Sequence, residues 1–191
     1  MMKKNVIIVA GANGSGKTTF SKIFLEKYSY FFLNADEIAK ELNPDDVNSV
    51  QFSAGREYFS RLKNLIANGD NFIIESTLSG KGISGIIDKL KENGYGVTIL
   101  YLYLESVNVC KARVAQRVQR GGHHIPDEDL IRRYWRSKSN FWLKYKNQVD
   151  EWSLYYNSND TFEEVGFGIA DDYEISNNEI FKLFKGGITN E

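Results

Sequence analysis

A short apolar run near the start of the chain leads directly into a glycine-rich loop that ends in Lys-Thr. Residues 6–10 read Val-Ile-Ile-Val-Ala, and residues 11–18 read Gly-Ala-Asn-Gly-Ser-Gly-Lys-Thr, which matches the spacing G-x-x-x-x-G-K-[ST]. Glycines let successive backbone N–H groups curl around phosphate oxygens, because glycine adopts conformations that a Cβ forbids. The sequence therefore predicts a strand–loop–helix unit that binds the phosphates of a nucleotide.

The residues of this loop have separate expected roles. Lys17 places a positive charge on the β- and γ-phosphates, Thr18 offers a hydroxyl to Mg²⁺, and the following helix points the positive end of its dipole at the same phosphates. A dinucleotide-binding loop would need glycine where Asn13 stands. The expected nucleotide-binding residues are Gly11, Ala12, Asn13, Gly14, Ser15, Gly16, Lys17, Thr18 and Thr19.

The composition is that of an ordinary globular protein. Hydrophobic residues make up 42% of the chain, charged residues 26%, and the formal net charge is −1, so we expect neither a membrane protein nor a nucleic-acid partner. The 191 residues suit a single domain, residues 1–191. One cysteine, Cys110, leaves no partner for an internal disulfide, and the N-terminal apolar run is too short for a signal peptide, so the expected compartment is the cytoplasm.

Short apolar runs alternate with helix-period segments, which is typical of an α/β protein with a mostly parallel sheet. The expected strands are residues 5–10, 31–34, 71–75 and 97–104, with weaker signals at 153–157 and 165–170. The expected helices are residues 17–28, 35–42, 50–68, 83–93, 107–119, 127–149 and 178–184. Gly69 and Gly94 are expected to end their helices in left-handed caps. The pattern predicts a three-layer α/β/α fold of the P-loop NTPase type.

Polar residues follow two of these strands, where a parallel sheet collects its reactive groups. Asp36 can accept a proton from an attacking hydroxyl or hold a Mg²⁺-bound water, and its alternative role is the N-cap of the next helix. Glu75 can orient the water of the metal or accept hydrogen bonds from a substrate hydroxyl, and Thr77 can bind the same substrate. The alternative for Glu75 is a solvated acid at a strand end.

Two rows of arginines flank a Gly-Gly segment. They are Arg113, Arg117 and Arg120 before the glycines and Arg132, Arg133 and Arg136 after them. This arrangement predicts a helical lid over about residues 117–137 that closes on the transferring phosphoryl group, and the alternative is a solvated surface paired with nearby acids. His123 and His124 lie in the intervening loop without a third ligand for zinc.

Aromatic and basic residues alternate after this lid. Such interleaving can form a stacking surface for single-stranded nucleic acid. Tyr134, Phe141, Trp142 and Tyr145, however, fall close to one helical stripe, which favours a role in the core.

Taken in order, these motifs resemble those of the zeta-toxin-like P-loop kinases over about residues 4–160. The resemblance comprises the phosphate-binding loop with Thr19, then Asn34-Ala35-Asp36, then Glu75-Ser76-Thr77-Leu78, then Arg-Gly-Gly-His with Ile125-Pro126, and finally Ile-Arg-Arg-Tyr-Trp-Arg-Ser at residues 131–137. The Gly-Gly-His segment leading into the arginine pairs is much more specific to this group than the loop is. One departure is Tyr156-Asn157-Ser158, where members of the group often have Asp-Asn-Ser.

The resemblance implies an ATP- and Mg²⁺-dependent phosphotransferase. In the characterised toxins the acceptor is a UDP-amino sugar, phosphorylated at its 3′-hydroxyl, and an antitoxin protein is an expected partner. Lys17 would hold the phosphates, Thr18 the Mg²⁺ with a water-mediated contribution from Asp36 or Glu75, and Asp36 would be the base. Glu75 and Thr77 would contact the acceptor. Of the lid arginines, Arg120 and Arg133 are favoured for the transferring group, followed by Arg117 and Arg136.

Two other functions fit the same motifs. One is a nucleotide-gated regulatory ATPase or toxin–antitoxin component that binds a protein or nucleic acid, and the other is a nucleoside or polynucleotide-end kinase. The chain has no Asn-Lys-x-Asp guanine signature, which favours ATP.

Overall fold

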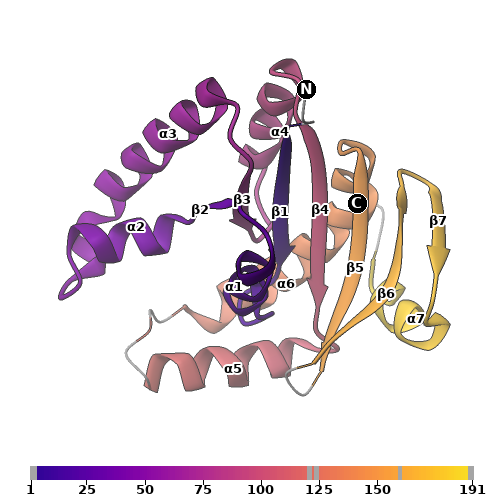
Figure 1. The fold of residues 1–191 in the computed structure, drawn as a ribbon. Helices are drawn as coiled ribbons and strands as arrows, with labels where there is room; N and C mark the ends of the chain where they lie inside the picture. Colours follow the sequence, from indigo (N-terminus) through magenta and orange to yellow (C-terminus); the bar gives the residue numbers. More distant parts are fainter. Residues whose placement is uncertain (1–3, 120–121, 123–124, 159–160, 189–191) are drawn as a thin grey trace.

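A single mixed sheet forms the centre of the protein. The computed structural model describes residues 4–119, 122, 125–158 and 161–188. The strands are β1 (Asn5–Gly11), β2 (Phe31–Leu33), β3 (Phe72–Ser76), β4 (Gly96–Tyr103), β5 (Glu151–Ser158), β6 (Thr161–Ile169) and β7 (Asp172–Ile175). They form a seven-stranded sheet in the order β2-β3-β1-β4-β5-β6-β7 (Figure 1). The first five strands of this order run parallel, and β6 and β7 are antiparallel additions at one edge.

Helices cover both faces of the sheet. They are α1 (Lys17–Lys27), α2 (Ala35–Leu42), α3 (Gln51–Asn68), α4 (Gly82–Glu92), α5 (Val107–Gln119), α6 (Asp127–Leu143) and α7 (Asn178–Lys185), with short 3₁₀ helices η1 (Val47–Val50) and η2 (Tyr145–Asn147). Alternate residues of β1 pack against different layers, because successive side chains of a strand point to opposite faces. Val6 and Ile8 join the core shared with α3, α4, α6 and α7, whereas Ile7 and Val9 pack with Phe20 of α1. The predicted three-layer architecture is confirmed.

Several local predictions are also confirmed. Gly69 and Gly94 adopt φ values of 75° and 76° at the ends of their helices, as left-handed caps require. The aromatic stripe of the long helix is buried in the core, and so is Cys110. Within the described residues, no helix combines the length and apolar character needed to cross a bilayer.

Two features differ from the expected elements. The helix predicted over residues 127–149 ends at Leu143 and is followed by η2. The apolar period continues across this break because Tyr145 is fully buried, so periodicity alone could not reveal it. Strand β7 was not predicted, since its four residues are too few to establish an alternating pattern. It forms by pairing with β6 in a hairpin whose turn contains Ala170 at φ 49°.

Candidate active site

The phosphate-binding loop connects β1 to α1 in the context that the sequence predicts. Gly11, Gly14 and Gly16 all have positive φ, at 145°, 81° and 88°. A Cβ on Gly11 would lie 2.4 Å from the carbonyl oxygen of Leu102, and a Cβ on Gly16 would lie 2.4 Å from Asn157 Nδ2. The loop therefore requires glycine at both positions, for backbone conformation and for space.

Lys17 is folded back over this loop. Its Nζ donates to the carbonyl oxygens of Gly11 and Ala12, both at 2.9 Å. Because an ammonium group has three N–H donors, one donor is left for a phosphate oxygen. Burial lowers the pKa of Lys17, and the nearby carboxylate of Glu75 opposes that shift. The lysine is thus held beside the loop, where its charge lacks full hydration.

The opposite side of the loop is tethered to β5. Asn157 Nδ2 donates to the carbonyl oxygen of Ser15 at 2.8 Å, and Arg113 donates to the carbonyl oxygen of Asn157 at 3.3 Å. Within the described residues, Asn13 Oδ1, Ser15 Oγ and Asn157 Oδ1 are buried without hydrogen-bond partners. Buried polar atoms without partners are rare in folded proteins. Together with the glycine cradle and the remaining Lys17 donor, they fit a loop that binds a polyanionic nucleotide.

Glu75 lies at the centre of a hydrogen-bond network beside Thr18. The β1–β3 register pairs Val9 with Glu75, so the end of β3 lies next to the loop. Glu75 Oε2 accepts from Thr18 Oγ1 at 3.0 Å and from Asn34 Nδ2 at 2.9 Å, and Oε1 accepts from Ser21 Oγ at 2.9 Å. The structure therefore places Glu75 next to the hydroxyl expected to face Mg²⁺. Carboxylate and hydroxyl oxygens are the ligand types that Mg²⁺ prefers.

Burial raises the pKa of Glu75, and the Lys17 charge and the Ser21 and Thr18 hydrogen bonds oppose this effect. When the pKa of a carboxyl group is higher in the folded than in the unfolded chain, the group contributes stability at pH values below its unfolded-state pKa. This contribution is lost as the pH rises through its folded-state pKa. Because glutamine does not titrate, we expect Glu75→Gln to remove this loss of stability at higher pH. The unfolding free energy of the parent, minus that of the variant, should decrease as the pH rises above the ordinary pKa of a glutamate side chain, about 4.3.

Urea titrations without nucleotide measure this difference at each pH. Glu92→Gln, at the exposed end of α4, controls for the loss of one carboxylate. If the difference in unfolding free energy between the parent and Glu75→Gln stays constant across the pH range, ionisation of Glu75 does not destabilise the folded state.

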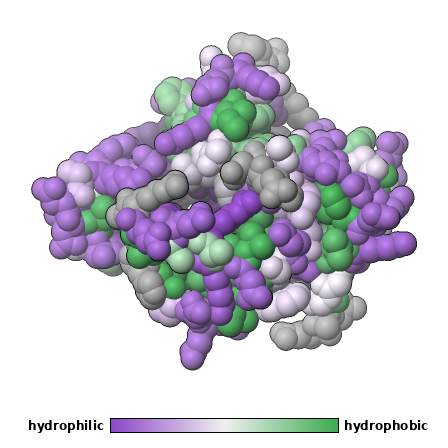
Figure 2. Space-filling model, turned by 90° about the horizontal axis from the view of Figure 1, so that it is seen from below, coloured by the Kyte–Doolittle hydropathy of each residue, from purple (hydrophilic) through white to green (hydrophobic). Residues whose placement is uncertain are grey.

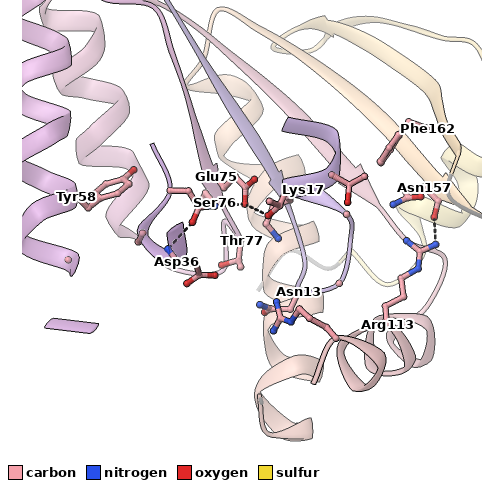
Figure 3. A pocket seen from close by; sticks show the side chains of 18 of the residues that line it. Asn13, Lys17, Asp36, Tyr58, Glu75, Ser76, Thr77, Arg113, Asn157 and Phe162 are labelled. Atoms are coloured by element: carbon pink, nitrogen blue, oxygen red, sulfur yellow. Dashed lines mark hydrogen bonds between the residues drawn. The ribbon is translucent and has the colours of Figure 1, made fainter. Parts of the chain in front are cut away.

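Asp36 lies in the first turn of α2, and its predicted alternative role as the N-cap is wrong. The N-cap is Asn34, whose Oδ1 accepts from the backbone N–H groups of Asp36 and Glu37 at 2.8 and 3.3 Å. Because Asn34 satisfies these donors, the carboxylate of Asp36 is not needed for capping. It lines the same cavity as Lys17 (Figure 3).

This cavity has a volume of about 640 Å³ and joins two ends of the site. At one end are the phosphate-binding loop, Arg113, Asn157 and Phe162. At the other end are Asp36 and Thr77, with Tyr58 and Phe59 contributed by α3. Figure 3 shows Tyr58 on the α2–α3 side and Arg113 and Asn157 on the β5 side, with Lys17 and Glu75 between them. The edge of the molecule that carries the site presents many hydrophilic residues (Figure 2).

The described arginines of the two rows face different cavities. Arg113 and Arg117, from α5, line the first cavity. Arg132, Arg133 and Arg136, from α6, line a second cavity of about 520 Å³ that shares Ser76 and Thr77 with the first. Arg120, His123 and His124 lie outside the described residues, and the described residues contain no cluster of potential metal-ligating His, Cys, Asp or Glu.

Sequence reasoning assigned no role to several residues that the fold brings to the site. They are Ser21, Asn34, Tyr58, Phe59 and Phe162. Asn34 had a recognisable signal, since asparagine directly before an expected helix is a preferred N-cap. The aromatic residues of α3 had none, because their helical period indicates only an amphipathic helix.

Similarity to known proteins identifies the family of this chain. The zeta toxin family model matches residues 2–163. An uncharacterised protein of Haemophilus influenzae is 33% identical over 134 residues, which cover 70% of this chain and 95% of that protein.

Two solved complexes share the fold. The toxin–antitoxin system PezAT of Streptococcus pneumoniae gives a TM-score of 0.67 at 16% identity, covering 97% of this chain and 80% of the neighbour. The AvrRxo1-ORF1:ORF2 complex with ATP gives 0.71 at 15% identity, and the match spans 99% of this chain but only 66% of the longer neighbour. The chain belongs to the zeta toxin family, and its fold and phosphate-binding loop are those of a P-loop kinase.

Proposed function

We propose that the protein transfers the γ-phosphoryl group of ATP, with Mg²⁺, to a hydroxyl group of a small-molecule acceptor. The observation that carries this proposal is the cavity of about 640 Å³ that Lys17 and Asp36 both line. Phosphoryl transfer needs charge stabilisation at the phosphates and a group that positions and deprotonates the attacking hydroxyl. The two ends of this cavity supply these two functions.

Each residue of the site has a separate proposed role. Lys17 and the N–H groups of the loop stabilise the phosphate charge, and Asp36 accepts the proton of the attacking hydroxyl. Thr18 and Glu75 would supply oxygen ligands to Mg²⁺, directly or through water. When bound, Mg²⁺ neutralises the charge that develops on the phosphate oxygens. Arg117, which lines the same cavity, adds positive charge there, and Arg120 and Arg133 are the further arginines proposed to stabilise the transferring group.

The acceptor end of the cavity is suited to a ring-containing hydroxyl compound. Tyr58 and Phe59 form an aromatic wall, and aromatic side chains pack well against bases and the apolar faces of sugars. Thr77, with Glu75 behind it, contributes hydrogen-bonding groups. A UDP-amino sugar combines a base, a sugar and free hydroxyl groups, and it is our first candidate for the acceptor.

A protein partner is part of the proposal. Two structural neighbours come from a toxin–antitoxin system and from the AvrRxo1-ORF1:ORF2 pair. Family membership supports an antitoxin that binds this chain and blocks its activity.

The experiment is a transfer assay with labelled ATP, Mg²⁺ and a panel of hydroxyl acceptors that includes UDP-N-acetylglucosamine. The Lys17→Ala variant is the blank. We expect label on an acceptor only with the parent protein. Hydrolysis of ATP with no acceptor labelled across the panel would contradict the kinase proposal and favour a nucleotide-gated switch.

A further inference from the structure

The two faces of the sheet are packed differently at its antiparallel end. Trp152 of β5, which pairs with Gly168 of β6, belongs to the core shared with α6 and α7. Ser153 and Phe167 form the adjacent cross-strand pair, so their side chains point to the opposite face. In the described part of the chain, the apolar cluster on that face draws its helix residues from α1 alone, and it does not extend to Phe167.

Two large apolar side chains are exposed on this second face. Phe167 is 45% exposed and Ile169 is 60% exposed, and both point the same way because a single residue separates them in β6. The outward face of an antiparallel sheet is usually polar. A single exposed apolar residue is common, but these two line one hollow of about 440 Å³. We call this surface the open sheet face, formed by Thr98, Phe167 and Ile169 with Glu151, Asp172 and Glu174.

The core side of the β6–β7 hairpin is closed without Phe167 and Ile169. A Cβ on Gly168 would lie 2.4 Å from Tyr173 Cβ, so the side chain of β7 fills the space over this glycine. The ring of Tyr173 then packs against Trp152, with ring centroids 5.7 Å apart. Since Phe167 and Ile169 lie on the other face, the core does not depend on them, and substitutions there should leave the fold intact.

The rim of the hollow carries only negative charge. Glu151, Asp172 and Glu174 line it, and no lysine or arginine of the described residues does. The β6–β7 register places Asp172 opposite Ile169 and Glu174 opposite Phe167, so carboxylates flank the apolar pair. Over the ranges that the structure describes, none of the three carboxylates forms an ion pair. A complementary surface would therefore be apolar at its centre and positively charged around it.

The open sheet face lies away from the phosphate-binding loop. Thr98 pairs with Ile7 of β1 and with Glu151 at the start of β5, whereas the loop follows Gly11 at the other end of β1. The hollow shares no lining residue with the cavity that contains Lys17. A molecule bound to the open sheet face would therefore leave the nucleotide site accessible.

We infer that the open sheet face docks an amphipathic α-helix of a partner protein, with an apolar stripe flanked by lysine or arginine residues. Helices are the elements that cover a sheet in this architecture, and β6 and β7 lie at the sheet edge away from α1 (Figure 1). The apolar stripe would bury Phe167 and Ile169, and the cations would pair with the three carboxylates. This interaction goes beyond phosphate transfer and does not depend on it.

Two labelled peptides with equal numbers of leucine and lysine residues test the inference. In one peptide the leucines form a helical stripe, and in the other they alternate with the lysines as in a strand. Binding to the full chain is measured by fluorescence anisotropy. We expect the helical peptide to bind in the micromolar range, and the alternating peptide to bind at least about tenfold more weakly. A helical peptide with glutamate in place of lysine should not bind.

Substitutions on the open sheet face should weaken binding of the helical leucine–lysine peptide. Phe167→Thr should do so at least about tenfold, because it removes the apolar contact and keeps a residue suited to strands. Glu174→Gln should do so by up to about fivefold, as expected for one exposed ion pair. Phe31→Thr is the matched control, since Phe31 is an exposed phenylalanine of β2 at the other edge of the sheet. It should bind the peptide like the parent.

Several results would overturn the inference. One is absence of binding by the helical peptide, and another is binding that Phe167→Thr leaves unchanged. Tighter binding of the alternating peptide would show that the partner adds a strand to β7. A dimer of the parent that Phe167→Thr dissociates, measured by analytical ultracentrifugation, would show that a second copy of this chain covers the face. Competition between the helical peptide and Mg²⁺ with the ATP analogue AMP-PNP would place the peptide in the nucleotide site.

Discussion

Replacing Lys17 by alanine is expected to lower the rate of phosphate transfer by roughly 10³-fold, about 4 kcal/mol of transition-state stabilisation. The physical reason is the position of the ammonium group, which the Gly11 and Ala12 carbonyls hold at 2.9 Å beside the phosphate-binding loop. Alanine removes the charge at the place where negative charge increases during transfer. The measurement is the rate of label transfer under saturating ATP and acceptor.

A matched control separates this effect from general damage to the helix. Lys22→Ala changes an exposed lysine of the same helix, α1, and should transfer phosphate at the parent rate. Because Lys17 also bonds to the loop, the melting temperature of Lys17→Ala should be compared with that of the parent. A properly folded Lys17→Ala variant with at least a tenth of the parent rate would refute the role assigned to this lysine.

Asp36→Asn should lower transfer by roughly 10²- to 10⁴-fold, the range associated with loss of a general base. Asparagine has nearly the same shape but cannot accept the proton of the attacking hydroxyl. Since Asn34 caps α2, the substitution should leave the helix intact, and nucleotide affinity should be close to that of the parent. Transfer rates and nucleotide binding are therefore measured on the same preparations.

The neighbouring residue provides the control for this second prediction. Glu37→Gln also removes one carboxylate from the first turn of α2, where Glu37 pairs with Lys40 on the surface. It should retain the parent activity, because Glu37 does not line the cavity. If Asp36→Asn and Glu37→Gln lower the transfer rate equally, the reaction depends on the negative charge of the first turn of α2, and Asp36 has no role as a base.

Local patterns predicted most of the fold. Strand β1 is apolar from Val6 to Ala10 because these residues are buried on both faces, as parallel strands covered by helices are. The 3.6-residue period located the seven α-helices that the described residues contain. It failed at Lys144, where Tyr145 continues the apolar period across the break, and at β7, whose four residues depend on pairing with β6.

The site was only partly predictable, because some of its residues reach the cavity through tertiary packing that no local pattern reveals. The sequence singled out Lys17 in the phosphate-binding loop and Asp36 and Glu75 after strand ends, and the structure gathers all three around one cavity. Tyr58 and Phe59 also reach that cavity, yet nothing in their local pattern distinguishes them from other residues of an amphipathic helix. Their position depends on where α3 lies beside the β2 edge of the sheet (Figure 1).

The sequence by itself determined the phosphate-binding loop, because the glycines, the lysine and the flanking strand and helix are contiguous and encode their own conformation. Only the tertiary structure decided that Glu75 would bond to Thr18, Ser21 and Asn34, and that the described arginines of the two rows would face separate cavities. These relationships depend on strand order, register and helix crossing. Such long-range geometry is set by the packing of the whole core, and no local pattern of residues contains it.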